Sequence, residues 1–238
     1  MLPIVRRTIF GTTLVVAAGC FGLAAWQTKR LITRRAANAK ATAQRDLPIV
    51  DLNREQPSGD PTYRRAVAQG AFDSAHEFRI RNRLVQGTPG VHIITPLLLT
   101  GRDTAVLADR GFVPAPDAID PGKVEYGEPG PKQVGGVLFP VPDFGDGKPL
   151  KRSGEETWQR LDLAAIRRRV PYPVASYYLI VEADPDHPAE HTIRGRTLPI
   201  RITPPALDDG PHLSYAIQWV LIGGAVLGFG VFFVRREP

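Results

Sequence analysis

Hydrophobic residues gather in two long uncharged runs near the ends of the chain, Ile9 to Trp26 and Tyr215 to Val234. Each run has about the 20 residues that a helix needs to cross a hydrocarbon core of roughly 30 Å. A helix also satisfies its own backbone hydrogen bonds, which lipid cannot do for it. The pattern therefore predicts two transmembrane helices, at residues 9–26 and 215–234.

The first run also has features of a cleaved signal peptide, because Arg6 and Arg7 precede an apolar core. Against cleavage, the run is long for a signal core, and Trp26, Gln27 and Lys29 stand where small residues would be expected. We therefore interpret it as a retained anchor. Two spans then place both ends of the chain on one side of the membrane.

This topology divides the chain into five segments. They are a cytoplasmic N-terminus (1–8), the first span (9–26), an extracytoplasmic domain (27–214), the second span (215–234) and a cytoplasmic C-terminus (235–238). The second span sets the orientation, because Arg235 and Arg236 follow it while Asp208 and Asp209 precede it. The first span favours the opposite orientation, since the basic residues after it outnumber those before it: Lys29, Arg30, Arg34 and Arg35 against Arg6 and Arg7.

Small residues in both spans suit close helix packing. Gly224 and Gly228 form a GxxxG pattern in the second span, and Gly19 and Gly22 lie in the first. Glycine is frequent in membrane helices in general, so this pattern leaves direct pairing of the two spans open.

Strand-like alternation begins after the helix-forming residues that follow the first span, and it covers residues 63–113. One predicted face carries Phe78, Ile80 and Leu84, and the other carries three arginines: Arg79, Arg81 and Arg83. Residues 91–99 and 104–113 are expected to form a pair of strands around a turn at residues 100–103.

The second half of this domain is more irregular. Residues 114–149 are rich in proline and glycine and are predicted to be a flexible insertion, interrupted by one strand at Gln133 to Phe139. A short helix is expected at 159–169, and two strands at 175–183 and 197–203. The sequence therefore predicts an α+β membrane protein, whose extracytoplasmic domain is a mainly antiparallel β barrel or sandwich with one or two short helices.

Composition narrows the partners of this domain. The net charge of the 238-residue chain is +6, which is compatible with anionic lipid or nucleic acid. An extracytoplasmic domain makes nucleic acid an unsuitable partner, which leaves the lipid bilayer. The single cysteine, Cys20, lies in the first span, so the domain would contain no disulfide.

Two patterns suggest chemistry in this domain. His187-Pro-Ala-Glu190-His191 matches the H-x-x-E-H pattern of inverted zinc peptidases, which requires both histidines on one face of a helix. Prolines and a glycine surround the motif, so a solvated loop is the better interpretation. The arginine stripe at residues 79–83 suits a carboxylate or phosphate, but a solvated sheet face explains it more simply.

A third pattern lies at the start of the second span. On a helix that begins near Pro211, the side chains of His212, Tyr215 and Trp219 fall on one stripe. A flat apolar cofactor would fit such a stripe, because an imidazole can ligate iron and aromatic rings can cover a macrocycle. The alternative is an interfacial histidine with Tyr and Trp as membrane anchors, and periodicity alone favours that alternative.

The segment His212-Leu-Ser-Tyr215-Ala-Ile-Gln218-Trp219 resembles the C-terminal signature of the surfeit locus protein 1 (Surf/Shy) family of cytochrome c oxidase assembly factors. Other blocks agree in order: Trp26-Gln27 with Arg30, Asn82-Arg83, Gly87-x-x-Gly90, Thr95-Pro96-Leu97, Asp109 to Pro114, Trp158 with Leu161-Asp162, and Tyr177-Tyr178-Leu179. The departures are Phe112 for a usual Trp, Ala24 for Gly, Thr33 for Trp, and Gly210-Pro211 in place of asparagines before the histidine.

The resemblance implies a non-enzymatic factor that binds haem a and helps to insert it into the catalytic subunit of the haem a-containing oxidase. His212 matches the proposed iron ligand of the family; Tyr215, Trp219 and Trp26 would flank the ring, and nearby arginines would meet the propionates. Haem A synthase is a further expected partner. Low lysine beside abundant arginine, alanine, glycine and proline favours a bacterial plasma (inner) membrane, with the large domain on the periplasmic side.

Two alternatives remain from the sequence. The protein could be a haem-free scaffold that holds the immature oxidase subunit, with His212 only as an anchor. The weaker alternative is a membrane-anchored zinc peptidase at His187, Glu190 and His191.

Overall fold

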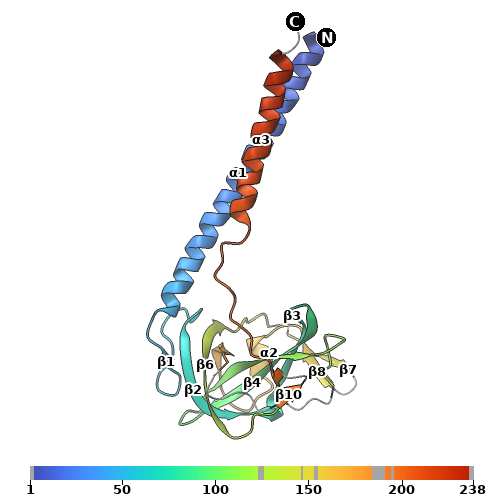
Figure 1. Cartoon of the computed structure of the whole chain (residues 1–238). Coiled ribbons are helices and arrows are strands. Elements are labelled where there is room, and N and C mark those ends of the chain that lie inside the picture. Colours follow the sequence, from blue (N-terminus) through green and yellow to red (C-terminus); the bar gives the residue numbers. More distant parts are fainter. Residues whose placement is uncertain are drawn as a thin grey trace. The chain divides into compact units, whose positions relative to one another are not determined.

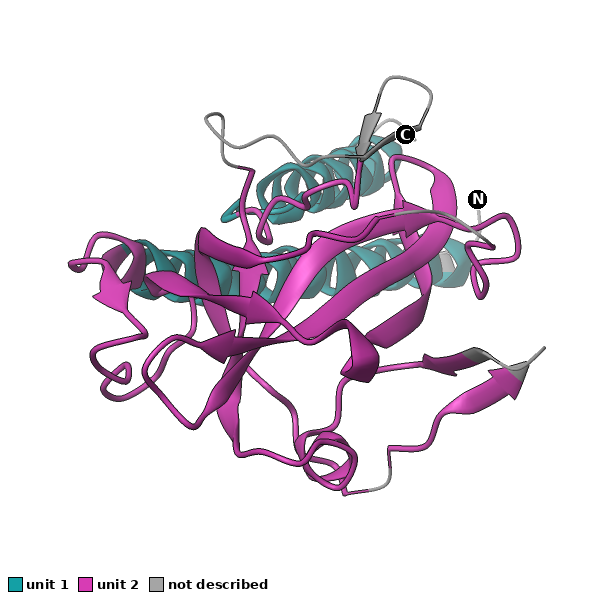
Figure 2. Cartoon of the chain, turned by 90° about the horizontal axis from the view of Figure 1, so that it is seen from below, with its two compact units in different colours: residues 1–42, 207–238 teal, residues 43–206 magenta. Residues whose placement is uncertain are grey.

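The computed structural model describes residues 3–122, 126–145, 147–152, 155–183, 191–193 and 196–235. The chain divides into two compact units, coloured teal and magenta in Figure 2. One unit contains residues 1–42 and 207–238 and is helical, and the other contains residues 43–206 and consists mainly of strands. The helical unit is therefore assembled from the two ends of the chain.

The helical unit pairs α1 (Pro3–Arg45) with α3 (His212–Arg235). The two helices run antiparallel, with both chain ends at the same end of the pair (Figure 1). Both are long and apolar enough to cross a membrane. The first helix continues past its apolar run through helix-forming residues and ends just before Pro48, as its sequence predicted.

The two helices pack along a seam with a seven-residue period. On α3 the buried residues are Ala216, Gly223 and Gly230. On α1 the buried residues of the seam are Ala17, Cys20, Ala24 and Leu31. Seven-residue spacing is the heptad pattern of coiled coils, and small side chains at the seam let the two backbones approach closely.

The spans therefore pair directly, but through glycines other than those of the GxxxG pattern. A Cβ on Gly224 or Gly228 would meet no atom within 4 Å, whereas a Cβ on Gly230 would lie 2.5 Å from Thr13 Oγ1. A Cβ on Gly223 would lie 3.1 Å from that of Cys20. The GxxxG spacing had left the pairing open, and it does not mark the contact because the seam follows a seven-residue register.

The second unit is built around one large sheet. Its described strands are β1 (Val50–Asp51), β2 (Arg65–Phe72), β3 (Phe78–Val85), β4 (Thr88–Leu99), β5 (Ala105–Pro114), β6 (Pro131–Pro140), β7 (Leu150–Arg152), β8 (Glu155–Trp158) and β9 (Val174–Val181). A separate hairpin joins β10 (His191–Ile193) to β11 (Arg196–Leu198). The short helices are η1 (Ser74–His76) and α2 (Leu163–Arg167).

Strands β2, β6, β9, β5 and β4 form a closed barrel, because β4 also pairs with β2. Within this ring only the β5–β9 contact is parallel. The ring closes beside Gly70, where a Cβ would lie 2.1 Å from the carbonyl oxygen of Leu98. A barrel-like, mainly antiparallel domain with few helices is therefore confirmed.

Among the described residues of the domain there are three hydrophobic clusters, and the two larger ones are described here. The first draws alternate residues from all five barrel strands and so fills the barrel: Ala66, Ala68, Leu97, Leu99, Val106, Ala108, Val134, Leu138, Leu179 and Val181. The second packs α2 and β8 against the sheet: Phe78, Ile80, Ile94, Leu107, Trp158, Leu163 and Ile166. Burial of large apolar side chains is the main stabilising contribution in this unit.

Strand β3 departs from the predicted alternation. Phe78 and Ile80 are buried, but Leu84 is 71% exposed. The register with β4 shifts after Ile80, and Asn82 in the shifted segment has a φ of +58°. This bulge moves the following side chains by one position, so Leu84 leaves the face of Phe78 and Ile80.

Other predicted elements differ in extent. The helix expected at 159–169 is limited to α2, because the Asp162 side chain caps its first turn through Ala165 N at 2.9 Å. The strand expected at 197–203 ends with β11, although Ile200 forms an isolated bridge with Phe112. Residues 114–149 contain the predicted strand as β6, and Tyr126 and Glu128 in that stretch are buried.

Candidate functional site at the start of α3

A tight turn precedes α3. The Asp208 carboxylate accepts a hydrogen bond from the backbone N–H of Gly210 at 2.9 Å, and Gly210 has a φ of +64° that glycine tolerates without strain. Pro211 follows, and proline is favoured at a helix start because it lacks an N–H that would be unsatisfied there. The Pro211 carbonyl accepts from the N–H of Tyr215 at 3.1 Å, so His212 is the first residue of α3.

Polar side chains of α1 hold this turn in place. Arg34 Nε donates to the carbonyl oxygen of Asp208 at 3.0 Å, and Asn38 Nδ2 donates to the same oxygen at 2.8 Å. Arg35 pairs with the Asp209 carboxylate at 2.8 Å. Exposed ion pairs stabilise by about 1 kcal/mol at most, but together these contacts fix the start of α3 against α1.

His212 is half-buried and turned toward α1. Its Nδ1 lies 2.9 Å from Oε1 of Gln27, which follows Ala24 by three residues on the seam. The opposite edge of the imidazole lies beside Gly210. A Cβ at Gly210 would lie 3.6 Å from His212 Cδ2 and 3.8 Å from Nε2, so residue 210 brings no side chain to this edge of the ring.

The other three residues of the candidate site are close to Gln27 or His212 in the sequence of their helices. Trp26 is adjacent to Gln27 in the chain and is 52% exposed, and Tyr215, one turn after His212, is 45% exposed. Trp219 is half-buried and follows His212 by seven residues, the repeat of the seam. The guanidinium of Arg30 lies 5.7 Å from the Trp26 ring, in a cation–π contact. The three aromatic residues thus lie within about two helical turns of Gln27 or His212 along their own helices, and a cation lies beside the Trp26 ring.

Comparison with known proteins decides the family. The model of the SURF1 family matches residues 14–224. The chain belongs to the SURF1 family. It is also 27% identical over 228 residues to SURF1-like proteins of Mycobacterium bovis and Mycobacterium tuberculosis, which covers 90% of this chain and 78% of each relative. SURF1 proteins are generally linked to cytochrome c oxidase assembly, and the family is one of assembly factors and not a known enzyme family.

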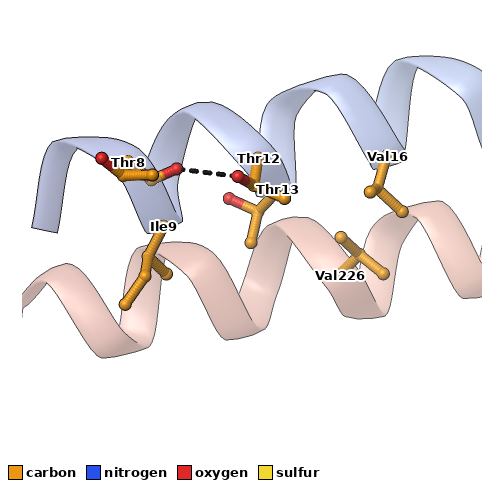
Figure 3. A pocket seen from close by; sticks show the side chains of 6 residues that line it. All are labelled: Thr8, Ile9, Thr12, Thr13, Val16 and Val226. Atoms are coloured by element: carbon orange, nitrogen blue, oxygen red, sulfur yellow. Dashed lines mark hydrogen bonds between the residues drawn. The ribbon is translucent and has the colours of Figure 1, made fainter. Parts of the chain in front are cut away.

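A groove of about 230 Å³ lies nearer the other end of the SURF1 helix pair (Figure 3). It is lined by Thr8, Ile9, Thr12, Thr13, Val16 and Val226. The hydroxyls of Thr8 and Thr12 each donate to a carbonyl one turn earlier, at 2.9 Å. The lining is therefore apolar in effect and suits a lipid chain more than a reacting group.

The peptidase motif finds no support in the part of the chain that the structure describes. His187 and Glu190 lie outside it, and His191 begins the strand β10, whereas the peptidase pattern requires a helix. Among the described residues, no group of three or more His, Cys, Asp or Glu side chains could hold a metal ion.

The arginine stripe of β3 has a structural role. Arg81 donates to the carbonyl oxygen of Thr157 at 3.1 Å, and Arg83 donates to that of Gln159 at 3.3 Å. Arg79 Nε lies 3.5 Å from Glu77 Oε1. Two of these arginines therefore bind β8 and the residue after it to β3, which the alternation pattern did not predict.

Sequence reasoning missed a buried charge network around Arg110, in the block Asp109 to Pro114. Arg110 is only 1% exposed, and its guanidinium contacts Glu128 at 3.1 Å and Glu77 at 3.5 Å. Arg201 pairs with Glu128 at 2.8 Å, and the Tyr126 hydroxyl donates to Glu77 at 2.8 Å. Burial, together with the Glu77 carboxylate, raises the pKa of Tyr126 well above its ordinary value of 10.0.

The sequence feature that could have indicated this network is Arg110, which lies among apolar residues in the strand β5. Charged side chains are rarely fully buried unless they are paired, so such a position predicts buried partners without naming them. The network ties the residues around Tyr126 and Arg201 to the barrel.

Proposed function

We propose that this chain is a haem a chaperone, which receives haem a and passes it to the catalytic subunit of the haem a-containing oxidase during assembly. The observation that carries this proposal is the position of His212. Its imidazole is held through Nδ1 by Gln27, while its Nε2 edge borders on Gly210, which has no side chain. Neutral imidazole is a common axial ligand of haem iron.

The neighbouring residues fit a haem as cargo. Trp26, Tyr215 and Trp219 offer aromatic surface to a macrocycle, and the first two expose about half of their area. Arg30, held over the Trp26 ring, would supply the positive charge for a propionate carboxylate. The site would therefore hold iron, ring and carboxylate with three different kinds of side chain.

Membership of the SURF1 family supports the link to oxidase assembly. In the proposed role, the oxidase catalytic subunit accepts the haem, and haem A synthase is the proposed donor. The chain itself forms no bond with the cargo other than iron coordination and non-covalent contacts, so the role is not enzymatic.

The proposed location is a bacterial inner membrane, crossed twice, with both ends cytoplasmic and the β domain periplasmic. The opposing charge signal of the first span is weakened by the ion pairs, because Arg34 and Arg35 contact Asp208 and Asp209. Arg6 donates to the carbonyl of Val234, which accords with both ends on one side. Reporters fused after residue 120 and at the C-terminus test the topology, and an exported C-terminal reporter would rule it out.

One observation favours the scaffold as a second candidate. The hydrogen bond between His212 and Gln27 crosses the helix seam, and polar seam residues can serve only to fix the register of paired helices. On that reading the β domain holds the immature oxidase subunit, and His212 has no contact with haem.

The visible absorption spectrum of the full chain separates the two candidates. The protein would be purified in detergent from cells that make haem A, as wild type, His212→Ala and His76→Ala. His76 is a matched control, because it is a half-buried histidine in the β domain. We expect a haem a spectrum in wild type and His76→Ala that is lost or shifted in His212→Ala. Equal spectra in all three would place the haem elsewhere, and no haem in any would favour the scaffold.

A further inference from the structure

The seam between α1 and α3 contains a polar side chain next to the histidine. From Ala17 to Leu31 the buried seam residues of α1 are small or apolar, and Gln27 falls in their repeat, three residues after Ala24 and four before Leu31. Gln27 is half-buried there. An amide in such a place costs free energy unless it is hydrogen-bonded, so its partner matters.

That partner is the imidazole of His212, 185 residues away in the sequence. Gln27 Oε1 lies 2.9 Å from His212 Nδ1, which is the distance of a good hydrogen bond. With Oε1 of Gln27 facing the ring, the amide oxygen accepts, and the proton of a neutral imidazole is then on Nδ1. The lone pair is then on Nε2.

We propose that Gln27 is a positioning residue for His212, which fixes the Nδ1–H tautomer and so leaves the lone pair on Nε2, at the ring edge where Gly210 brings no side chain. This inference rests on the proposed function, since its purpose is to prepare His212 for iron. In metal sites, ligating histidines almost always donate their other N–H to a carbonyl or carboxylate, and removal of that acceptor weakens the metal site.

Three features of the structure serve this arrangement. The start of α3 cannot shift along α1 easily, because Arg34 and Asn38 both bind the carbonyl oxygen of Asp208. The turn at Gly210 brings backbone and no side chain to the Nε2 edge. Seam packing at Ala216 sets the distance between the helices, so the Gln27–His212 contact is held from both sides.

The tautomer can be measured without haem. We would record nitrogen-15 NMR of the histidine side chains in the full-length apo protein in detergent, and assign His212 by comparison with His212→Ala among the five histidines. At a pH where the ring is neutral, we expect His212 as the Nδ1–H form in wild type. The form should persist in Gln27→Glu, which keeps an acceptor, and give way to a mixture in Gln27→Leu, which does not.

Titration with purified ferric haem a then tests the consequence. We expect Gln27→Leu to weaken binding about 10- to 100-fold, and Gln27→Glu to bind within a few-fold of wild type. Gln218→Leu is the matched control, because it makes the same substitution at an exposed position of α3 and should bind as wild type.

The outcomes separate this inference from the proposed function. Binding that is lost in His212→Ala but unchanged in Gln27→Leu would keep the function and overturn the role of Gln27. An Nε2–H form in the wild-type apo protein would also overturn it. No haem a binding by wild type would overturn the proposed function, and with it the purpose of the contact, while the NMR result would still decide whether Gln27 sets the tautomer.

Discussion

The helix pair and the β domain differ in the size and charge of the side chains that they bury. Along the helix seam, α3 contributes only small residues at its buried positions, Ala216, Gly223 and Gly230. The β domain buries large side chains, and among them is the full charge of Arg110 with two carboxylates, Glu77 and Glu128. One unit is organised by close approach of backbones, and the other by volume and charge pairing.

The difference fits the proposed surroundings of the two units, which are a membrane for the helix pair and water for the β domain. Between helices in lipid, burying an apolar side chain gains little, because the lipid is as apolar as the neighbouring helix, so packing and hydrogen bonds decide the contact. In a water-soluble barrel, each large apolar side chain removed from water stabilises by roughly 1.5–3 kcal/mol. A barrel can therefore tolerate the cost of a buried ion network that a thin helix seam could not.

Removal of Arg110 should have the largest effect. Arg110→Met leaves the Glu77 and Glu128 carboxylates without their shared partner inside the domain, and we expect a loss of roughly 3–5 kcal/mol in the free energy of unfolding. Denaturant unfolding of the full chain in detergent, followed by the β-sheet signal, measures it.

Arg83→Met is the control for this prediction. Arg83 donates to the carbonyl oxygen of Gln159 and is half-buried, so its loss should cost about 1 kcal/mol or less. Equal losses in the two variants would mean that the Arg110 network adds nothing beyond an ordinary hydrogen bond.

Overpacking the helix seam should come next. Gly230→Ile forces a side chain against Thr13, and we expect it to weaken helix pairing by about 1–3 kcal/mol. Distances between spin labels on α1 and α3 would report the separation. Gly228→Ile makes the same change on the open face, where no atom lies within 4 Å of a new Cβ, so it should leave the distances unchanged.

Alkaline pH should destabilise the buried charge network around Arg110, because Tyr126 loses its proton. Its pKa is raised in the folded state, so its contribution to stability is complete below the unfolded value of 10.0 and is lost as the pH rises above it. Tyr126→Phe should be less stable than wild type at pH 7, by about 1–3 kcal/mol for a hydrogen bond to a charged group. Between pH 10 and 12 the difference in the free energy of unfolding between wild type and Tyr126→Phe should become smaller. A difference that stays constant over that range would show that Tyr126 is not linked to the proton equilibrium.

The smallest effect is expected at the charged end of the helix pair. Asp209→Asn removes the ion pair with Arg35, whose side chains are about half exposed, and should cost about 1 kcal/mol or less. Thermal unfolding at low salt and in 1 M salt measures it. Wild type and variant should converge in high salt, because exposed charge pairs are screened.

Much of the fold was predictable because it depends on local periodicity. The two apolar runs became α1 and α3, and the strand pair around residues 100–103 became β4 and β5. Errors arose where a single residue changed which face of a strand the following side chains lie on. Asn82 in a left-handed conformation reversed the faces of β3, and this conformation leaves no mark in the alternation of hydrophobic residues.

The candidate site was predictable only in part. The spacing of His212, Tyr215 and Trp219 identified a stripe, and the resemblance of its residues to a known family gave the stripe a function. The partner of the histidine was not predicted, because Gln27 lies beyond the first apolar run as one polar residue among many.

The sequence by itself determined which segments are helices and strands and where the membrane-length runs lie. Only the tertiary structure decided that Gly223 and Gly230 form the seam, that Glu77 and Glu128 meet Arg110, and that Gln27 meets His212. The physical reason is the distance in the sequence between the residues that interact. Secondary structure follows from steric preferences and from patterns within a few residues. Tertiary contacts join residues up to 228 positions apart through the packing of whole elements, as the contact between Arg6 and Val234 shows.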